Sequence, residues 1–199
     1  MKNHMTRQSG VLMIEVLITI LIVSLGLLGI AATFARSQLV SDEAYQRYQA
    51  LELAHQLSEQ LSTNRTEAAK GAGSAYVTDV SGSLVAGDSG FARATACASC
   101  NSTQMAAMDL TAFHDGIVGA QKTQAGTKIS PLTGARGCVE FLGTAGDVSD
   151  PPRYRISVAW QGRQASALTA NASTCASEHY PDAEKQKLRR VISLEVQVL

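Results

Sequence analysis

The N-terminal third of the chain consists of an apolar stretch followed by an amphipathic stretch. From Val11 to Ala35 nearly every residue is apolar, no proline occurs, and Glu15 is the only formal charge. As a helix, this run extends roughly 37 Å at about 1.5 Å per residue, which exceeds the roughly 30 Å of a bilayer core. The pattern therefore predicts a membrane-spanning helix.

Beyond Ala35, apolar residues recur at spacings of three and four with charged residues mostly between them, which is typical of an amphipathic helix. The apolar stripe consists of Ala44, Tyr48, Leu51, Ala54, Leu57 and Leu61. Neither proline nor glycine interrupts Ile30 to Arg65, and glycine returns at Gly71 and Gly73. We expect one helix from about Val11 to Asn64. The apolar stripe of its C-terminal half should pack against a sheet.

Two glycines, Gly26 and Gly29, are the weak points inside this helix. Each costs about 1 kcal/mol relative to alanine. They favour either close packing against neighbouring helices, as small residues permit in membranes, or a site of local unwinding.

The remaining sequence predicts one further helix and three strands. Asn101 is a suitable N-cap because Gln104 follows three residues later. The apolar stripe of this helix is Ala106, Leu110, Phe113 and Ile117. The β-type runs are Gly137–Leu142, Tyr154–Trp160 and Arg190–Leu199, and the last two alternate between apolar and other residues. We expect a three-stranded antiparallel meander on one face of the long helix, which is an α+β fold.

Composition and charge exclude several classes of function. The chain has 17 basic and 17 acidic residues, and this balance argues against a nucleic-acid-binding protein, which needs a concentrated basic surface. The four histidines are scattered, and none has metal-ligand spacing to a second ligand. No glycine-rich phosphate loop or nucleophile triad occurs. We therefore expect no enzymatic activity, no cofactor and no metal.

All four cysteines, Cys97, Cys100, Cys138 and Cys175, follow the apolar segment, and an even number there predicts disulfides in an oxidising compartment. A zinc site is less favoured because only Cys97 and Cys100 form a close pair. Four cysteines allow three connectivities. In a meander, the start of the first strand and the loop after the second lie at the same end of the sheet. That geometry favours Cys138 with Cys175, a bridge worth roughly 3–4 kcal/mol, and leaves Cys97 with Cys100.

The Cys97-Ala98-Ser99-Cys100 motif ahead of a helix also occurs in thioredoxin-type redox sites. Those sites need a preceding core strand, and Phe91–Ala96 is a poor strand. A structural disulfide is favoured, and a membrane-anchored thiol oxidoreductase is the alternative.

The residues before the apolar run predict its orientation. MKNHMTRQSG contains Lys2 and Arg7 and no acid, so the N-terminus should stay in the cytoplasm while the chain after Ala35 is exported. A cleaved secretory signal fits poorly, because its apolar region is about 7–15 residues long and no A-x-A-like site follows. A simple anchor leaves Glu15 unexplained, since a carboxylate in a spanning helix costs several kcal/mol unless it is paired.

Ser9-Gly10 followed by Val11-Leu12-Met13-Ile14-Glu15-Val16-Leu17-Ile18 resembles the class III signal of type IV prepilins and pseudopilins. The resemblance implies cleavage by a prepilin peptidase between Gly10 and Val11 and methylation of the new N-terminus. Glu15 would be the fifth mature residue, which neutralises the α-amine of a neighbouring subunit during assembly. Val11 departs from the phenylalanine that is usual in this family.

The resemblance also implies a domain organisation. It comprises a leader peptide (1–10), a transmembrane and filament-core helix (11–35), the amphipathic continuation of this helix (36–65) and a disulfide-bonded globular α+β domain (66–199).

Downstream motifs resemble those of PilV-type minor pilins. The motifs are Cys97-x-x-Cys100, Gln104-Met105-Ala106, Asp109-Leu110, Gly137-Cys138-Val139 and the Tyr154–Trp160 strand. The resemblance implies a subunit that joins other minor and major pilins and a large tip adhesin to prime pilus assembly, in support of adhesion and twitching motility. It implies contact with the inner-membrane assembly platform. Before assembly the protein would lie in the bacterial inner membrane with a periplasmic C-terminal domain, and after assembly it would lie on the cell surface. The alternative is an I-type pseudopilin of type II secretion.

Overall fold

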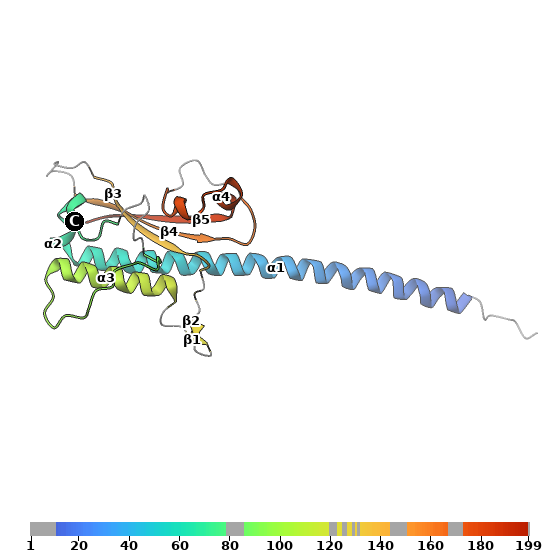
Figure 1. Cartoon of the computed structure of the whole chain (residues 1–199). Helices are drawn as coiled ribbons and strands as arrows, with labels where there is room; N and C mark the ends of the chain where they lie inside the picture. Colours follow the sequence, from blue (N-terminus) through green and yellow to red (C-terminus); the bar gives the residue numbers. More distant parts are fainter. Residues whose placement is uncertain are drawn as a thin grey trace, which may run out of the picture. The chain divides into compact units, whose positions relative to one another are not determined.

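The computed structural model describes residues 11–78, 86–119, 123–124, 127–128, 130, 132–143, 151–166 and 173–198. The chain divides into two compact units, Met1–Asp42 and Glu43–Leu199. Helix α1 (Val11–Thr63) is continuous and contributes to both units (Figure 1). The helix predicted from about Val11 to Asn64 is therefore confirmed, and Gly26 and Gly29 lie within its regular helical part.

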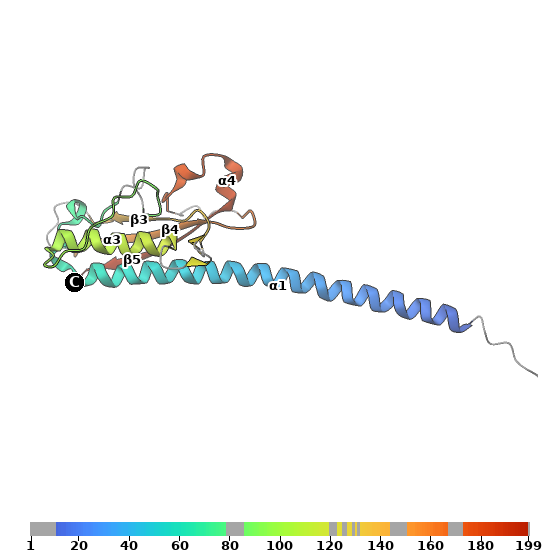
Figure 2. The same ribbon diagram turned by 60° about the horizontal axis from the view of Figure 1, so that its bottom comes forward.

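The larger elements of the second unit are those that the sequence pattern predicts. Helix α3 (Ser102–Val118) lies alongside the C-terminal part of α1 in both views (Figures 1 and 2). The sheet contains β3 (Arg136–Phe141), β4 (Arg153–Gln161) and β5 (Arg189–Gln197) in the order β3-β4-β5, with both pairs antiparallel. The α+β class and the three-stranded meander are confirmed, and the arrangement matches the description of a pilin-like fold.

Short elements that the sequence analysis did not predict lie between these larger ones along the chain. They are α2 (Arg65–Ala68), η1 (Gly71–Gly73), β1 (Thr123–Gln124), β2 (Thr127–Lys128), η2 (Ser177–His179) and α4 (Ala183–Leu188).

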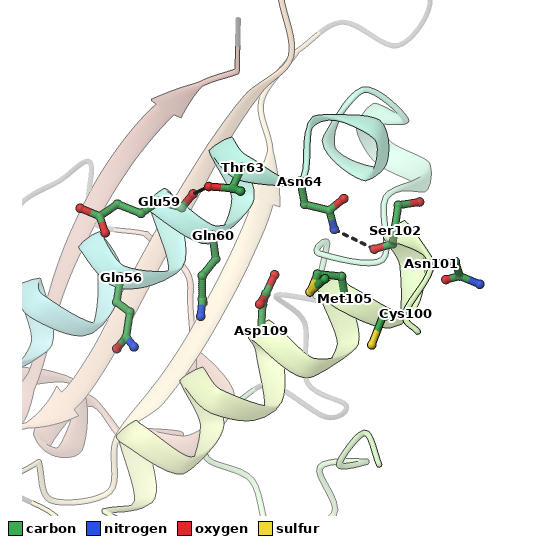
Figure 3. A pocket seen from close by; sticks show the side chains of 10 residues that line it. All are labelled: Gln56, Glu59, Gln60, Thr63, Asn64, Cys100, Asn101, Ser102, Met105 and Asp109. Atoms are coloured by element: carbon green, nitrogen blue, oxygen red, sulfur yellow. Dashed lines mark hydrogen bonds between the residues drawn. The ribbon is translucent and has the colours of Figure 1, made fainter. Parts of the chain in front are cut away.

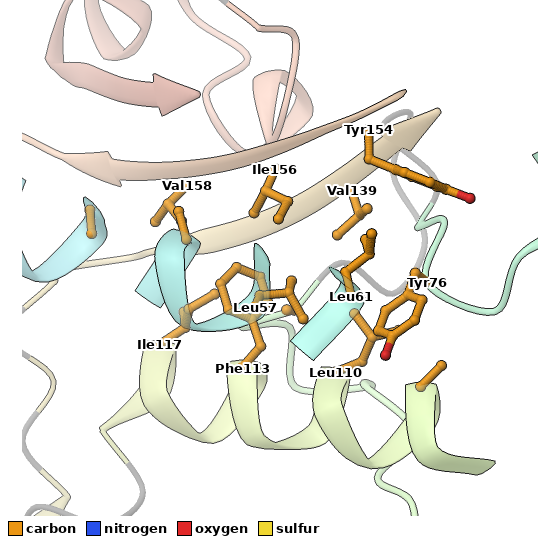
Figure 4. Packing of buried hydrophobic residues seen from close by; sticks show 14 of the residues in the cluster. Leu57, Leu61, Tyr76, Leu110, Phe113, Ile117, Val139, Tyr154, Ile156 and Val158 are labelled. Carbon is orange, nitrogen blue, oxygen red and sulfur yellow. The ribbon is translucent and has the colours of Figure 1, made fainter. Parts of the chain in front are cut away.

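The core lies where the C-terminal part of α1 meets the sheet and α3. Figure 4 shows Leu57 and Leu61 of α1 beside the apolar side chains of α3 and those of the inner sheet face. The predicted α3 stripe of Ala106, Leu110, Phe113 and Ile117 is buried, and so are Val139, Tyr154, Ile156 and Val158 of the sheet. Burial of this continuous apolar surface is the main stabilising contribution to the second unit.

The predicted contact face of α1 is correct only in its C-terminal half. Ala54, Leu57 and Leu61 are fully buried, whereas Ala44, Tyr48 and Leu51 are exposed. The face that packs against the rest of the unit continues through Ala50 and Gln46 instead. The error arises because α1 carries apolar residues on more than one face, and spacing alone does not tell which face is covered.

Close approach between α3 and its neighbours depends on two glycines. A Cβ on Gly137 of β3 would clash with Phe113 Cε1, and one on Gly116 of α3 would clash with Leu53 Cδ2. At the other end of the helix pair, Asn64 Nδ2 donates to the carbonyl of Ser102 at 2.7 Å. Helices α1 and α3 therefore run antiparallel, with the end of α1 tied to the start of α3.

The outer face of the sheet is also covered. Ser157 and Ala159 of β4 are fully buried, and Ala159 packs in a second cluster with Cys138, Cys175, Ala176 and Tyr180. The side chain of Arg189 is buried as well, and its Nη1 donates to the carbonyls of Ser173 and Cys175 at 2.8 and 2.7 Å. These bonds fix the segment that carries Cys175 against the sheet.

The outer edge of β3 is paired with chain from before α3. Gly137 exchanges backbone hydrogen bonds with Ala86 at 2.8 and 3.1 Å. Val139 accepts a bond from the backbone of Thr78 at 3.0 Å and donates to its hydroxyl at 2.7 Å. This edge of the sheet is thus closed at two positions.

Candidate functional site

The N-terminal part of α1 presents apolar side chains all around its circumference. The large apolar residues from Met13 to Phe34 are each at least 52% exposed. Within the described part of the chain, α1 is the one helix long and apolar enough to cross a membrane. A soluble monomer rarely exposes an apolar surface of this extent, because each apolar group in water carries a free-energy penalty.

Polar groups in this apolar segment are satisfied within the helix, with one exception. The hydroxyls of Thr19, Ser24 and Thr33 donate to helix carbonyls three or four residues earlier at 2.8, 2.7 and 2.8 Å. The Glu15 side chain is exposed and forms no hydrogen bond or ion pair with any described residue. Glu15 is therefore the one polar side chain of this segment that requires a partner from outside the described chain.

The predicted processing site is only partly described. Gly10 lies outside the described residues, as does the leader that precedes it. Val11 is the first residue of α1, and Glu15 lies one turn further along the same helix. Neither Gly26 nor Gly29 has a neighbour within 4 Å of the place where a Cβ would lie, so both leave open space at the helix surface.

The four cysteines form two disulfides, and the pairing is the one that the meander geometry favours. Cys138 pairs with Cys175, and Cys97 pairs with Cys100. Cys138 and Cys175 are fully buried, whereas the other two are half-buried just before the N-cap of α3. The Cys138–Cys175 bridge links β3 to the segment that covers the outer face of the sheet, and the Cys97–Cys100 bridge lies at the surface.

The Cys97–Cys100 bridge is part of a structured helix start. Both of its sulfurs lie 3.5 Å from Sδ of Met108. Asn101 and Gln104 form the predicted capping box, in which each side chain accepts from the other residue's backbone N–H at 2.8 and 3.0 Å. Residues 91–96 are not a strand, so the preceding core strand of a thioredoxin-type site is missing from this described segment.

A buried carboxylate, which the sequence analysis did not identify, joins α2 to α3. Glu67 is 1% exposed and accepts hydrogen bonds from Lys70 Nζ at 2.5 Å, the Ala75 backbone at 2.9 Å, and the Thr103 hydroxyl at 2.8 Å. Burial alone would raise the pKa of Glu67, but these bonds outweigh it and lower the pKa from 4.5 to about 2. No short-range sequence signal reveals this site, because Thr103 lies 36 residues further along the chain.

An open groove of about 660 Å³ lies between the end of α1 and the start of α3 (Figure 3). Gln56, Gln60 and Asn64 line one wall, and Met105 and Asp109 line the other. The hydroxyl of the fully buried Tyr76 donates to the Asp109 carboxylate between the two helices. Burial, with a smaller contribution from Asp109, raises the pKa of Tyr76, and burial also raises that of Asp109. The sequence signal for this groove is the recurrence of amides at positions 56, 60 and 64.

Comparison of the chain with protein-family models, curated proteins and solved structures gave no significant match. The inference of function therefore depends on the chain's own residues and their geometry.

We predict that the stability of the second unit falls at acid pH through Glu67. Because folding lowers the pKa of this group, its stabilising contribution is complete above about pH 4.5 and is lost as the pH falls towards 2. At neutral pH, Glu67→Gln should reduce the free energy of unfolding by about 2 kcal/mol, since a hydrogen-bonded buried charge is lost. Chemical denaturation of the full chain in detergent across this pH range measures both effects.

Glu184→Gln is the matched control. Glu184 also pairs with a lysine three residues away, at 2.6 Å, but its side chain is 81% exposed, so the substitution should change stability by less than about 0.5 kcal/mol. Equal effects of the two substitutions would show that the Glu67 cluster is not stabilising.

We predict that the two disulfides contribute unequally to stability. In the chain-entropy model, loss of the Cys138–Cys175 bridge, with a sequence separation of 37, costs roughly 4 kcal/mol, and loss of the Cys97–Cys100 bridge, with a separation of 3, costs roughly 2 kcal/mol. Urea denaturation of the paired Cys→Ser variants tests this order. Mild reductant on the folded protein should also open the half-buried bridge first, and earlier opening of Cys138–Cys175 would contradict the assigned burial.

Proposed function

We propose that this chain is a minor pilin of a type IV pilus, of the PilV type, which takes part in priming pilus assembly together with other pilins. The observation that carries the proposal is the apolar N-terminal part of α1, which no other described residue covers and in which Glu15 is the one polar side chain without a partner among the described residues. Such a surface needs lipid before assembly and the apolar helices of other subunits afterwards.

The proposed role of Glu15 follows from electrostatics in a low-dielectric environment. A carboxylate at this depth costs several kcal/mol unless a cation accompanies it. Cleavage between Gly10 and Val11 would create an α-ammonium group one helical turn away from Glu15 in the sequence. In a filament, the ammonium of one subunit can pair with Glu15 of the next, and this pairing sets the axial position at which subunits join.

The second unit suits a protein that works outside the cytoplasm. Its two disulfides need an oxidising compartment, and the helix with a basic leader ahead of it directs that unit to the periplasm. The proposed partners are other minor and major pilins, the prepilin peptidase, a large tip adhesin and the inner-membrane assembly platform. The proposed location is the inner membrane before assembly and the cell surface after it, where the pilus supports adhesion and twitching motility.

An I-type pseudopilin of type II secretion would have the same N-terminal helix and a small sheet domain. Deletion of the gene separates the two functions, because loss of surface pili with normal exoprotein release indicates the pilus, and the reverse indicates the secretion system.

We predict that the mature protein begins at Val11 with one added methyl group. Mass spectrometry of the N-terminal peptide from a membrane fraction measures this directly, and a peptidase-deficient strain supplies the unprocessed control. A mature protein that retains Met1 through Gly10 would have no ammonium group beside Glu15, and the proposed function would be rejected.

We predict that Glu15→Ala leaves leader cleavage intact and reduces incorporation into pili at least about tenfold, since loss of about 1.4 kcal/mol of pairing suffices for that factor. Immunoblotting of sheared pili against the membrane fraction measures incorporation. Thr19→Ala is the control on the same helix, because the Thr19 hydroxyl is satisfied by Val16 and should not be needed between subunits. Normal incorporation of the Glu15→Ala protein would contradict the proposed pairing.

A further inference from the structure

The groove between α1 and α3 is not explained by the proposed assembly through the apolar helix. It opens at the surface of the second unit and is closed off at one end by the bond from Asn64 to Ser102. Near its other end, the helices come together where Leu53 packs on Gly116. The result is a site between two helices, with the Tyr76 hydroxyl between them.

One wall of the groove carries amides that are free to bind a ligand. The side chains of Gln56 and Gln60 form no hydrogen bond with any described residue, and Figure 3 shows both directed from α1 towards the α3 side. Four residues along a helix correspond to a rise of about 6 Å. Two residues along an extended polypeptide span roughly 6.6 Å, so successive amides of this wall match alternate backbone groups of an extended chain.

The other wall supplies a negative charge and an apolar surface. Asp109 points from α3 into the groove in Figure 3, and the side chain of Met105 beside it is 44% exposed. Glu59 also lines the groove, whereas none of its lining residues is Lys, Arg or His. A ligand with a positive charge is therefore complementary to this site.

We propose that this groove binds an extended segment of a partner protein, whose backbone is bound by Gln56 and Gln60 and whose lysine or arginine side chain is bound by Asp109. A polypeptide uses both features of the site, the amide spacing and the charge. A small polyamine would use only the charge. A carbohydrate would usually stack on an exposed aromatic ring, and no aromatic residue is among those that line the groove.

The test uses the full chain in zwitterionic detergent micelles and a fluorescein-labelled octapeptide, (Lys-Thr)4, whose lysines all project to one side when it is extended. Fluorescence anisotropy should detect saturable binding. Asp109→Asn keeps an acceptor for the Tyr76 hydroxyl but removes the charge, and it should weaken binding at least about tenfold. Gln56→Ala with Gln60→Ala should weaken binding about three- to tenfold, because two neutral hydrogen bonds are lost.

Glu52→Gln is the matched control for charge, because Glu52 is an exposed carboxylate on α1 that does not line the groove. Its affinity for (Lys-Thr)4 should equal that of the wild type, and (Glu-Thr)4 should not bind. A thermal melt of each variant verifies folding, and Gln60→Lys, at a half-buried position on the groove wall, gives a second variant that should abolish binding.

Three results would overturn the proposal. The first is the absence of (Lys-Thr)4 binding up to millimolar concentration, and the second is equal weakening by Glu52→Gln and Asp109→Asn, which indicates general charge attraction. The third is full displacement of the peptide by an equal concentration of spermine or of chitotetraose, which would assign the groove to a polyamine or to a carbohydrate. Because the measurement needs no pilus, its failure leaves the proposed assembly role untouched.

Discussion

The structure depends on one constraint, which is that none of the described residues buries the N-terminal half of α1. A helix with apolar side chains on every side needs apolar surroundings on every side, and the described residues supply none to the segment from Met13 to Phe34. In such surroundings each polar group must find a partner, and the hydroxyls of this segment do so within the helix. The carboxylate of Glu15 has no such partner among the described residues, and this difference is the basis of the proposed role in association with other molecules.

The same helix changes character in the second unit, where one face is covered. Small residues such as Ala50 and Ala54 lie on the covered face together with Leu57 and Leu61, and all four are fully buried. Helix α3 reaches both α1 and β3, and it does so where Gly116 and Gly137 leave room for Leu53 and Phe113. Polar contacts from the chain that follows α1, through Asn64, Glu67 and Tyr76, then hold the N-terminal half of α3 in place.

Sequence alone predicted the elements whose signals are local. The capping pair Asn101 and Gln104 and the α3 stripe depend on neighbours within a few positions, and the structure confirms both. In β4 the predicted apolar face is buried, but Ser157 and Ala159 of the opposite face are fully buried as well, so burial does not alternate along this strand. Tyr48 and Leu51 were predicted to contact the sheet, but both are exposed. The prediction was wrong because periodicity identifies an apolar face without identifying what covers it. Glu67 and the groove at Asp109 were not predicted, since both are assembled from segments more than 30 residues apart. For the disulfides, sequence supplied the cysteines, and the meander topology was needed to favour one pairing.

The two edge strands of the sheet, β3 and β5, differ in whether their outer backbone groups are hydrogen-bonded. Thr78 and Ala86 occupy the free side of β3, whereas no described residue pairs with the outer backbone groups of β5 along most of its length. An unpaired edge is a template on which another polypeptide can form a further strand. Any extension of this sheet by a neighbouring molecule, whether in ordered assembly or in aggregation of misassembled protein, should therefore begin at β5, whose Arg190 and Glu195 already pair with Glu43 and Arg155.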